Sequence, residues 1–233
     1  MILLPIFREL DLLRYAAAIA GLADFAWKKL GHVQILCNNA GVCLPAAGFE
    51  VSDRDLQWQI DVNIRGVFNG LREFAPRFLK QGRQAWICNT GSHHSIGAPT
   101  KGVAIYVATK HAVLGLSEAF RTEFGDRVGV SVLCPGIVNT ALWDAGRNRP
   151  DEFGGAFAGD PRNAKALSTL GLDPERVGQL VVAGIRAGDF YIWTHPQDIE
   201  LIEKRYRESK VTIERQWPDG QMDEHKQTPH SVG

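Results

Sequence analysis

Tyr106 and Lys110 stand four residues apart in the run YVATK, and Ser92 lies fourteen residues before the tyrosine. Residues four apart share one face of a helix, so the phenol and the ammonium are expected to point into one cleft. A free tyrosine has a pKa of about 10, and a nearby cation lowers that pKa by favouring the phenolate. A serine hydroxyl across the cleft can bind a substrate oxygen. These three side chains therefore suit the interconversion of an alcohol and a carbonyl, provided that another group gives or takes the hydride.

Short strand-like runs alternate with longer helical runs along the chain. The strand-like runs are HVQILC (32–37), QAWICNT (84–90), RVGVSVLC (127–134) and DFYIWT (189–194). Helices are predicted at about 53–80, 103–124, 174–187 and 196–215. Ser52 with Asp55 is typical of a helix start, as is Asp173 followed by Pro174. The alternation predicts an α/β fold with a parallel sheet covered by helices on both faces.

Three unusual turns follow directly on three successive predicted strands. They are Asn38-Asn39-Ala40-Gly41, the turn at Ser92, and Pro135-Gly136. In parallel sheets of this kind ligands bind beyond the carboxyl ends of the strands. We therefore expect these turns to meet at one edge of the sheet and to form a single site there.

Composition narrows the class of protein. The chain has 233 residues, 45% of them hydrophobic, which is enough for one sizeable core. Its 26 acidic and 26 basic residues balance, so neither a nucleic-acid partner nor an anionic membrane is expected. Four cysteines without Cys-x-x-Cys spacing favour free thiols in a reducing compartment over a zinc site, and no metal is predicted.

The first residues, MILLPIFRELDLL, meet charged side chains too early for a signal peptide or a membrane span. An element packed onto the domain is favoured, with a peripheral amphipathic anchor as the open alternative. Cytoplasmic localisation is the expectation. One domain is predicted over 1–215, followed by a flexible tail at 216–233, where the sequence turns polar.

The order and spacing of these motifs resemble the short-chain dehydrogenase/reductase family, from about residue 12 to about 215. The similarity is carried by NNAG (38–41), DVNIRG around Asn63, NTGS ending at Ser92, YVATK (106–110) and PGIVNT (135–140). The resemblance implies a Rossmann-like doubly wound sheet and an NAD or NADP cofactor, with no preference readable between the two. It also implies homodimers or homotetramers that pair through the helices at about 53–80 and 103–124.

The resemblance implies a role for each catalytic residue. Tyr106 would be the acid/base, Lys110 would hold the nicotinamide ribose and lower the pKa of the tyrosine, and Ser92 would orient the substrate oxygen. Asn63 would distort its helix, so that a freed backbone carbonyl positions a water for proton relay. The alternative for Asn63 is an asparagine that the helix merely tolerates.

The resemblance also assigns the lining of the cofactor and substrate sites. Besides Tyr106 and Lys110, the cofactor residues would be Asn38, Asn39, Ala40 and Gly41 on the adenosine side and Pro135, Gly136, Val138 and Thr140 at the nicotinamide end. His94 and Trp143 would join Ser92 at the substrate, although a polar loop position and simple packing are the alternatives for them. Ser95 is a weaker rival for the hydroxyl role. The segment at about 141–172 corresponds to the family's substrate lid.

One departure from the family is large. Members begin with a strand and a glycine-rich turn that brings a helix N-terminus to the cofactor pyrophosphate. No such turn occurs in this sequence, and the expectation is that the first two to three strands of the sheet are missing. A remnant of the third strand is placed in MILLPIFRELDL.

Two functions from different classes follow. The first is an oxidoreductase that interconverts a secondary alcohol and a ketone by hydride transfer with NAD(P)(H), acting on a small molecule. The alternative is a cofactor-deficient, non-catalytic protein that oligomerises with relatives. An isomerase, epimerase or dehydratase on the same scaffold is a minor option.

Overall fold

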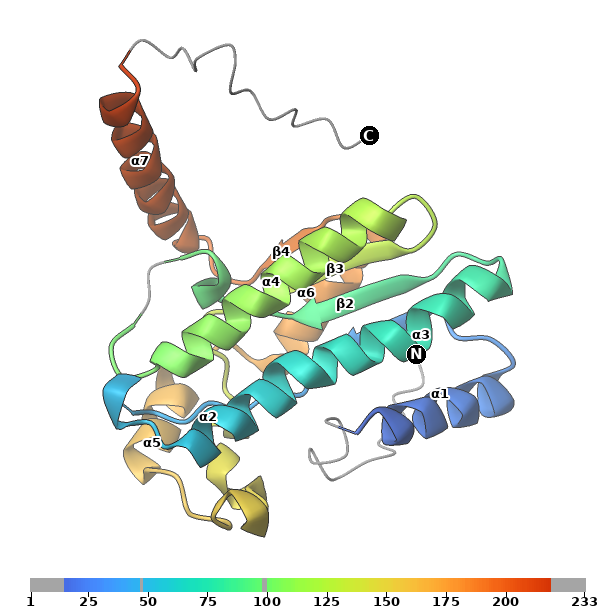
Figure 1. Cartoon of the computed structure of the whole chain (residues 1–233), viewed down its shortest axis with the longest axis horizontal. Helices are drawn as coiled ribbons and strands as arrows, with labels where there is room; N and C mark the ends of the chain where they lie inside the picture. The colour runs from blue at the N-terminus through green and yellow to red at the C-terminus, as the bar shows by residue number, and fades with distance from the viewer. Residues whose placement is uncertain (1–14, 47, 98–99, 219–233) are drawn as a thin grey trace.

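The computed structural model describes residues 15–46, 48–97 and 100–218, and the strands of this part form one parallel sheet (Figure 1). The strands are β1 (Ile35–Asn38), β2 (Trp86–Thr90), β3 (Gly129–Cys134) and β4 (Tyr191–Trp193), and they lie side by side in the order β1-β2-β3-β4. Each overlaps one predicted strand-like run. The expected Rossmann-like α/β fold with a parallel sheet is confirmed.

Helices cover both faces of this sheet, as predicted. On the face nearer the viewer in Figure 1 lie α1 (Ala16–Leu30), α3 (Gly66–Gln81) and α4 (Ala104–Phe124). Their apolar side chains form one buried cluster with Ile87 of β2. Behind the sheet lies α6 (Pro174–Ala187), whose Val177 packs against Cys88, Leu133 and Ile192. The sequence analysis had not singled out α1.

The long helix predicted at 53–80 is interrupted. It forms as α2 (Asp53–Ile60), a π-helical segment (Asp61–Arg65) and then α3. Ser52 caps α2 as predicted, because its Oγ accepts a hydrogen bond from the backbone N–H of Asp55 at 3.2 Å. The π-helical segment has Asn63 at its centre, so the helix is distorted at the residue where the resemblance placed a distortion.

The segment 141–172 contains more regular structure than its composition suggested. It forms 3-10 turns at Ala141–Asn148 and Asp151–Phe153 and a helix, α5 (Pro161–Leu170). Asp160 caps α5 through a 2.9 Å hydrogen bond from the backbone N–H of Arg162, and Pro161 follows it. This is the same Asp-Pro start that identified α6. Helix α5 was not among the helices predicted from the sequence.

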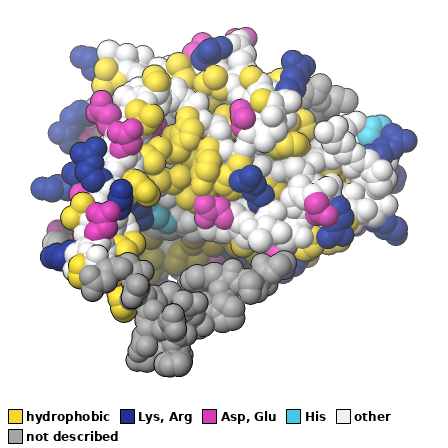
Figure 2. Space-filling view, turned by 90° about the horizontal axis from the view of Figure 1, so that it is seen from above, with side chains coloured by type: hydrophobic (Ala, Val, Ile, Leu, Met, Phe, Trp, Pro, Cys, Tyr) yellow, Lys and Arg dark blue, Asp and Glu magenta, His cyan; other side chains and the backbone are white. Residues whose placement is uncertain are grey.

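The last described helix, α7 (Asp198–Gln216), stands away from the sheet in Figure 1. Arg205 ties it to the rest of the fold, since its Nη1 donates to the backbone oxygen of Ile96 at 3.0 Å. Figure 2 shows hydrophobic side chains gathered in the middle of the face seen from above, flanked by lysines and arginines. Within the described residues no helix is both long and apolar enough to cross a membrane.

Some predictions fall on residues outside the described part. These are the strand remnant in MILLPIFRELDL and most of the tail predicted at 216–233. The single domain predicted over 1–215 is compatible with one shared sheet and stays a prediction beyond the described residues.

Candidate active site

Ser92 opens the turn that follows β2. A short 3-10 turn at His93–Ser95 begins there, and the Ser92 Oγ accepts a hydrogen bond from the backbone N–H of His94 at 3.2 Å. Ser95, the rival hydroxyl, accepts from the Ser92 backbone N–H at 3.1 Å and donates to the backbone oxygen of Lys110 at 2.8 Å. Ser95 therefore fastens the turn to α4, and its hydroxyl is committed to that task.

Tyr106 and Lys110 come from the N-terminal part of α4 and face the same turn. The Lys110 Nζ lies 5.6 Å from the centroid of the Tyr106 ring and donates to the backbone oxygen of Thr90 at 2.7 Å. A side-chain hydrogen bond joins Ser92 to the Tyr106 phenol. The structure thus brings together the three side chains that the sequence analysis combined.

The pKa of Tyr106 moves in the direction opposite to the one expected. Burial raises it well above 10, because the phenolate loses solvation, and the hydrogen bond from Ser92 only partly offsets this. Burial also lowers the pKa of Lys110 to about 8, and the lysine is only 3% exposed. Burial thus outweighs every lowering influence on this phenol, and the role of Lys110 in favouring the phenolate stays a prediction. The Lys110 ammonium lies over the ring and donates to Thr90.

Asn63 is fully buried and holds the chain after β1 against α4. Its Oδ1 accepts from the backbone N–H of Val42 at 2.8 Å, and its Nδ2 donates to the Val42 oxygen at 2.9 Å and to the Thr109 Oγ1 at 3.0 Å. An asparagine that the helix merely tolerates would have no such set of partners. The sequence analysis missed Thr109, although its place between Tyr106 and Lys110 in YVATK was the available signal.

The predicted adenosine-side residues line a cavity next to β1. This cavity, of about 140 Å³, is lined in part by Asn38, Asn39 and Ala40, together with residues of α1 and α3. The Asn38 side chain also has a structural role, since it donates to the Asn89 Oδ1 at 2.8 Å. A Cβ added at Gly41 would lie 3.4 Å from both the Asn63 Oδ1 and the Lys110 Nζ. Gly41 therefore lies against both the Asn63 amide and the Lys110 ammonium, and a side chain at position 41 would contact both groups.

The turn after β3 lies at the same edge of the sheet. The Gly136 backbone N–H donates to the Thr194 Oγ1 at 3.1 Å, and a Cβ at Gly136 would come within 2.7 Å of the His195 ring. Val138 forms an isolated parallel bridge with Leu172. Thr140 caps the turn at Ala141–Asn148. The roles of these residues and of Pro135 at a nicotinamide stay predictions.

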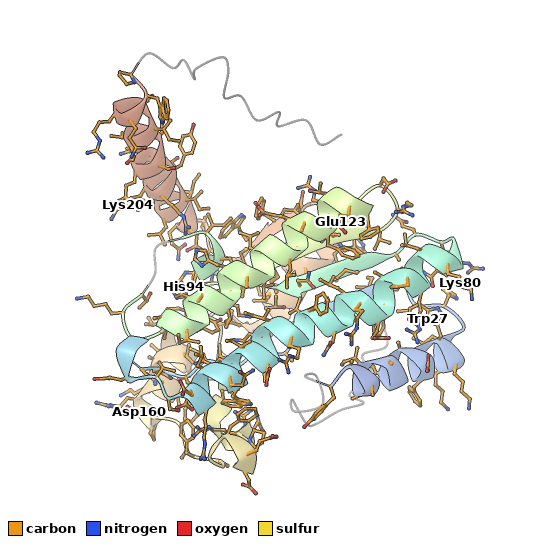
Figure 3. The ribbon with its side chains drawn as sticks, in the orientation of Figure 1. Trp27, Lys80, His94, Glu123, Asp160 and Lys204 are labelled. Carbon is orange, nitrogen blue, oxygen red and sulfur yellow. The ribbon has the colours of Figure 1, made fainter. Side chains whose placement is uncertain are left out.

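The two further substrate candidates lie in different surroundings. His94 is 8% exposed, and its ring meets that of Tyr106 edge-on, with centroids 6.3 Å apart. Figure 3 shows His94 beside the N-terminal half of α4 and near the start of α7. Trp143 lies half-buried in the segment 141–172, where its backbone and ring close on Gly159. His94 thus lies next to Tyr106, and the substrate roles of His94 and Trp143 stay predictions.

Comparison with known proteins identifies the family. The model of the short chain dehydrogenase family matches residues 6–151. The chain is 28% identical over 221 residues to a CLA biosynthesis dehydrogenase/reductase of Lactiplantibacillus plantarum, covering 90% of this chain and 74% of that protein. It is 34% identical to a 1-deoxy-11-beta-hydroxypentalenate dehydrogenase of Streptomyces avermitilis, covering 77% of this chain and 62% of that one. The chain belongs to the short chain dehydrogenase family.

A solved structure agrees with this assignment. A short chain dehydrogenase/reductase from Burkholderia phymatum, in complex with NAD, is 33% identical, with a TM-score of 0.79 over 86% of this chain and 74% of that one. The expectation of a missing N-terminal glycine-rich segment is not settled by these comparisons and stays a prediction.

The residues at the strand ends fit the nicotinamide half of such a cofactor. The Lys110 ammonium has three N–H donors and uses one on Thr90, its only hydrogen bond to the described residues. Its two other N–H donors suit ribose hydroxyls, which accept hydrogen bonds. The part of the chain that the structure describes contains no glycine-rich turn for a diphosphate. The fit therefore concerns the nicotinamide and its ribose.

Proposed function

We propose that the chain is an NAD(P)(H)-dependent oxidoreductase that interconverts a secondary alcohol and a ketone. The observation that carries this proposal is the convergence of the Ser92 hydroxyl, the Tyr106 phenol and the Lys110 ammonium at the carboxyl ends of β1 and β2. Lys110 would hold the ribose of the nicotinamide cofactor, and the cofactor would supply or accept the hydride when bound. The NAD-bound relative supports a nicotinamide cofactor without deciding between NAD and NADP for this chain.

In the reducing direction Tyr106 is the proton donor. Its raised pKa keeps the phenol protonated at neutral pH, so it can give its proton to the substrate oxygen as negative charge develops there. The Ser92 hydroxyl donates a second hydrogen bond to the same oxygen. In the oxidising direction Tyr106 must first lose its proton, and the positive charge of Lys110 then stabilises the phenolate.

Asn63 contributes by holding two parts of the site together. Its three hydrogen bonds hold the backbone at Val42, close to the turn that ends at Gly41, against the helix that carries Tyr106 and Lys110. The rim of the cofactor site and the catalytic helix are thereby fixed to each other. The relay water that the resemblance assigns to the Asn63 backbone carbonyl belongs to this proposal.

The partners and location complete the proposal. The substrate is a small alcohol or carbonyl compound, and two or four copies pair through the helices at about 53–80 (α2 to α3) and 103–124 (α4). Phe68 of α3, 46% exposed, is the large apolar side chain that such a contact would cover. The cytoplasm is the proposed compartment.

The test uses the full chain with the substitution Tyr106→Phe. Binding of NADH and NADPH is followed by fluorescence, and turnover is followed on a panel of secondary alcohols and ketones. We expect saturable binding of one cofactor and a loss of turnover of about 1000-fold in Tyr106→Phe, since a general acid contributes about 10²- to 10⁴-fold. Cofactor affinity should change by less than about threefold. Absence of saturable binding to either cofactor would contradict the proposal and favour the non-catalytic alternative.

A further inference from the structure

Only the first turns of α7 are tied to the rest of the described fold. Leu201 lies against Gly97, where an added Cβ would come within 3.4 Å of the leucine side chain. Arg205 donates to the backbone oxygen of Ile96 at 3.0 Å. Beyond Arg205, the hydrogen bonds and ion pairs that α7 side chains form with the described residues stay within the helix. The rest of α7 therefore projects from the fold, as Figure 1 shows.

This projecting helix carries a narrow apolar stripe. Along the helix the stripe consists of Ile199, Ile202, Tyr206, Ile213 and Trp217. At 3.6 residues per turn these five positions fall within about 60° of the helix circumference. Positions 199, 206 and 213 repeat every seven residues, which is the spacing of a coiled-coil seam and not that of a broad face packed on a globular core. We call these five residues the α7 seam.

The α7 seam is exposed to solvent. Ile199, Tyr206, Ile213 and Trp217 are 54–68% exposed, and Ile202 is half-buried. Of the thirteen exposed large hydrophobic side chains among the described residues, five lie between positions 199 and 217. Helices in proteins gain most of their stability by packing an apolar face, and isolated helices of about 12–15 residues are marginal in water. The exposed seam therefore indicates a helix that is built to be covered by a partner.

The sequence limits what that partner can be. Residues 219–233 carry only Met222 and Val232 as large apolar side chains, too few to cover the seam. The helix has five acidic and five basic side chains between positions 198 and 216, so it lacks the basic polar face of a helix that lies on an anionic membrane. A second helix with an apolar seam and balanced charges is the remaining kind of partner, and another copy of α7 is such a helix.

The charges beside the seam determine the orientation of such a pair. With Ile199 as the first position of a seven-residue repeat, Glu203 and Lys210 are fifth positions and Arg205 is a seventh. In a parallel pair seventh positions lie beside fifth positions of the partner, which would bring Arg205 next to Lys210, two like charges. In an antiparallel pair fifth positions lie beside each other, so Glu203 of one copy meets Lys210 of the other. Opposite charges attract there, and the antiparallel orientation is favoured.

We propose that the α7 seam binds the α7 seam of a second copy of this chain, in an antiparallel pair. Ile202 of each copy packs beside Ile213 of the other, and Tyr206 lies near the two-fold axis that relates them. Each Glu203 faces a Lys210. This interface is separate from the contacts proposed for α2 to α3 and α4. It does not rest on the proposed function, because it needs neither cofactor nor turnover.

The first experiment disrupts the seam in the full chain. The mass in solution is followed by analytical ultracentrifugation as a function of protein concentration, for the unsubstituted chain, Ile213→Glu and Val211→Glu. Val211 is the matched control, since it is 55% exposed on the same helix but lies outside the seam. We expect Ile213→Glu to weaken one association step by at least about 100-fold, because the symmetric pair loses two apolar contacts, and Val211→Glu to change it by less than about threefold. An unsubstituted chain that stays monomeric, or equal weakening in both variants, would overturn the proposal.

The second experiment tests the orientation and stays decisive if Ile213→Glu unwinds α7. It compares Glu203→Lys, Lys210→Glu and the double variant, with far-UV circular dichroism to check that the helix is kept. Each single change places like charges opposite each other and should weaken the association by about tenfold at low salt, whereas the double variant restores opposite charges and should return to within about threefold of the unsubstituted chain. A double variant as weak as the two single changes combined would refute the antiparallel pair. Association that none of the three variants changes would refute the seam as the interface.

Discussion

The proposed catalytic centre and the segment 141–172 are stabilised in contrasting ways. At the centre, side chains bond to partners distant in sequence: Asn63 to Val42 and Thr109, and Lys110 to Thr90. In the segment most bonds are local, such as those from the Arg147 side chain to the backbone oxygens of Ala141 and Asp144. The centre is therefore fixed by contacts between distant parts of the fold, whereas the segment 141–172 is stabilised mainly by contacts within itself.

Two features join the segment to the rest of the molecule. Ala145 and Phe153 belong to a small buried cluster with Trp58 of α2. Arg149 forms an ion pair with Asp55 at 2.7 Å, and both side chains are largely buried. Helix α5, by contrast, buries none of its residues. The comparison indicates that the centre tolerates little change and that the segment can open or vary at small cost, as expected of a substrate lid.

Among the substitutions that test this contrast, the largest effect is expected from Lys110→Met, which tests whether the buried lysine serves the reaction at a cost to the stability of the fold. Turnover should fall by at least about 100-fold, since the charge that stabilises the phenolate is lost. Burial lowers the lysine pKa from 10.5 to about 8, which corresponds to a cost of about 3 kcal/mol to the folded state. The free energy of unfolding at pH 7 should therefore rise in Lys110→Met by about 1–2 kcal/mol, after allowing for the lost bond to Thr90.

The sign of the pH dependence follows from the same lowered pKa. The cost of the buried ammonium is fully present below pH 8 and disappears as the pH rises towards 10.5, so the stability advantage of the variant should shrink over that interval. In the unsubstituted protein, kcat/KM should fall as the pH rises through about 8. Urea unfolding at pH 7 and pH 10 checks the first statement, and a pH–rate profile checks the second. A variant less stable at both pH values would show that the lysine is a structural residue.

The second prediction concerns Asn63→Ala, which tests the ties between distant parts of the centre. The variant leaves the buried N–H and oxygen of Val42 without their side-chain partner. We expect the free energy of unfolding to fall by about 3 kcal/mol, since each buried unpaired polar group costs about 1–3 kcal/mol. Asn163→Ala on exposed α5 is the matched control and should change stability by less than about 0.5 kcal/mol. Similar losses in both variants would remove the contrast between the two regions.

The same contrast explains what could be predicted from the sequence. The strands and most helices were predictable because buried apolar runs and caps such as Ser52 and Asp173 are local signals. The meeting of Ser92, Tyr106 and Lys110 followed from their places at strand ends and on one helix face. The direction in which the Tyr106 pKa shifts was not predictable, because it depends on how deeply the fold buries the phenol. The contacts of Asp198 with His93 and of Arg149 with Asp55 join residues that no sequence period relates.

The smallest effect is expected from Arg149→Ala, which removes the ion pair between the segment and α2. The partly buried pair should contribute about 1 kcal/mol to stability, so the free energy of unfolding should fall by about that amount in the variant. If the segment closes over substrate, KM should rise several-fold while kcat changes little, because the variant must order the segment each time it binds. Arg147→Ala is the matched control, since the hydrogen bonds and the ion pair of its side chain with the described residues stay within the segment. An equal rise of KM in both variants would point to lost positive charge near the substrate, and a fall of kcat alone would show that the tie to Asp55 supports the catalytic centre itself.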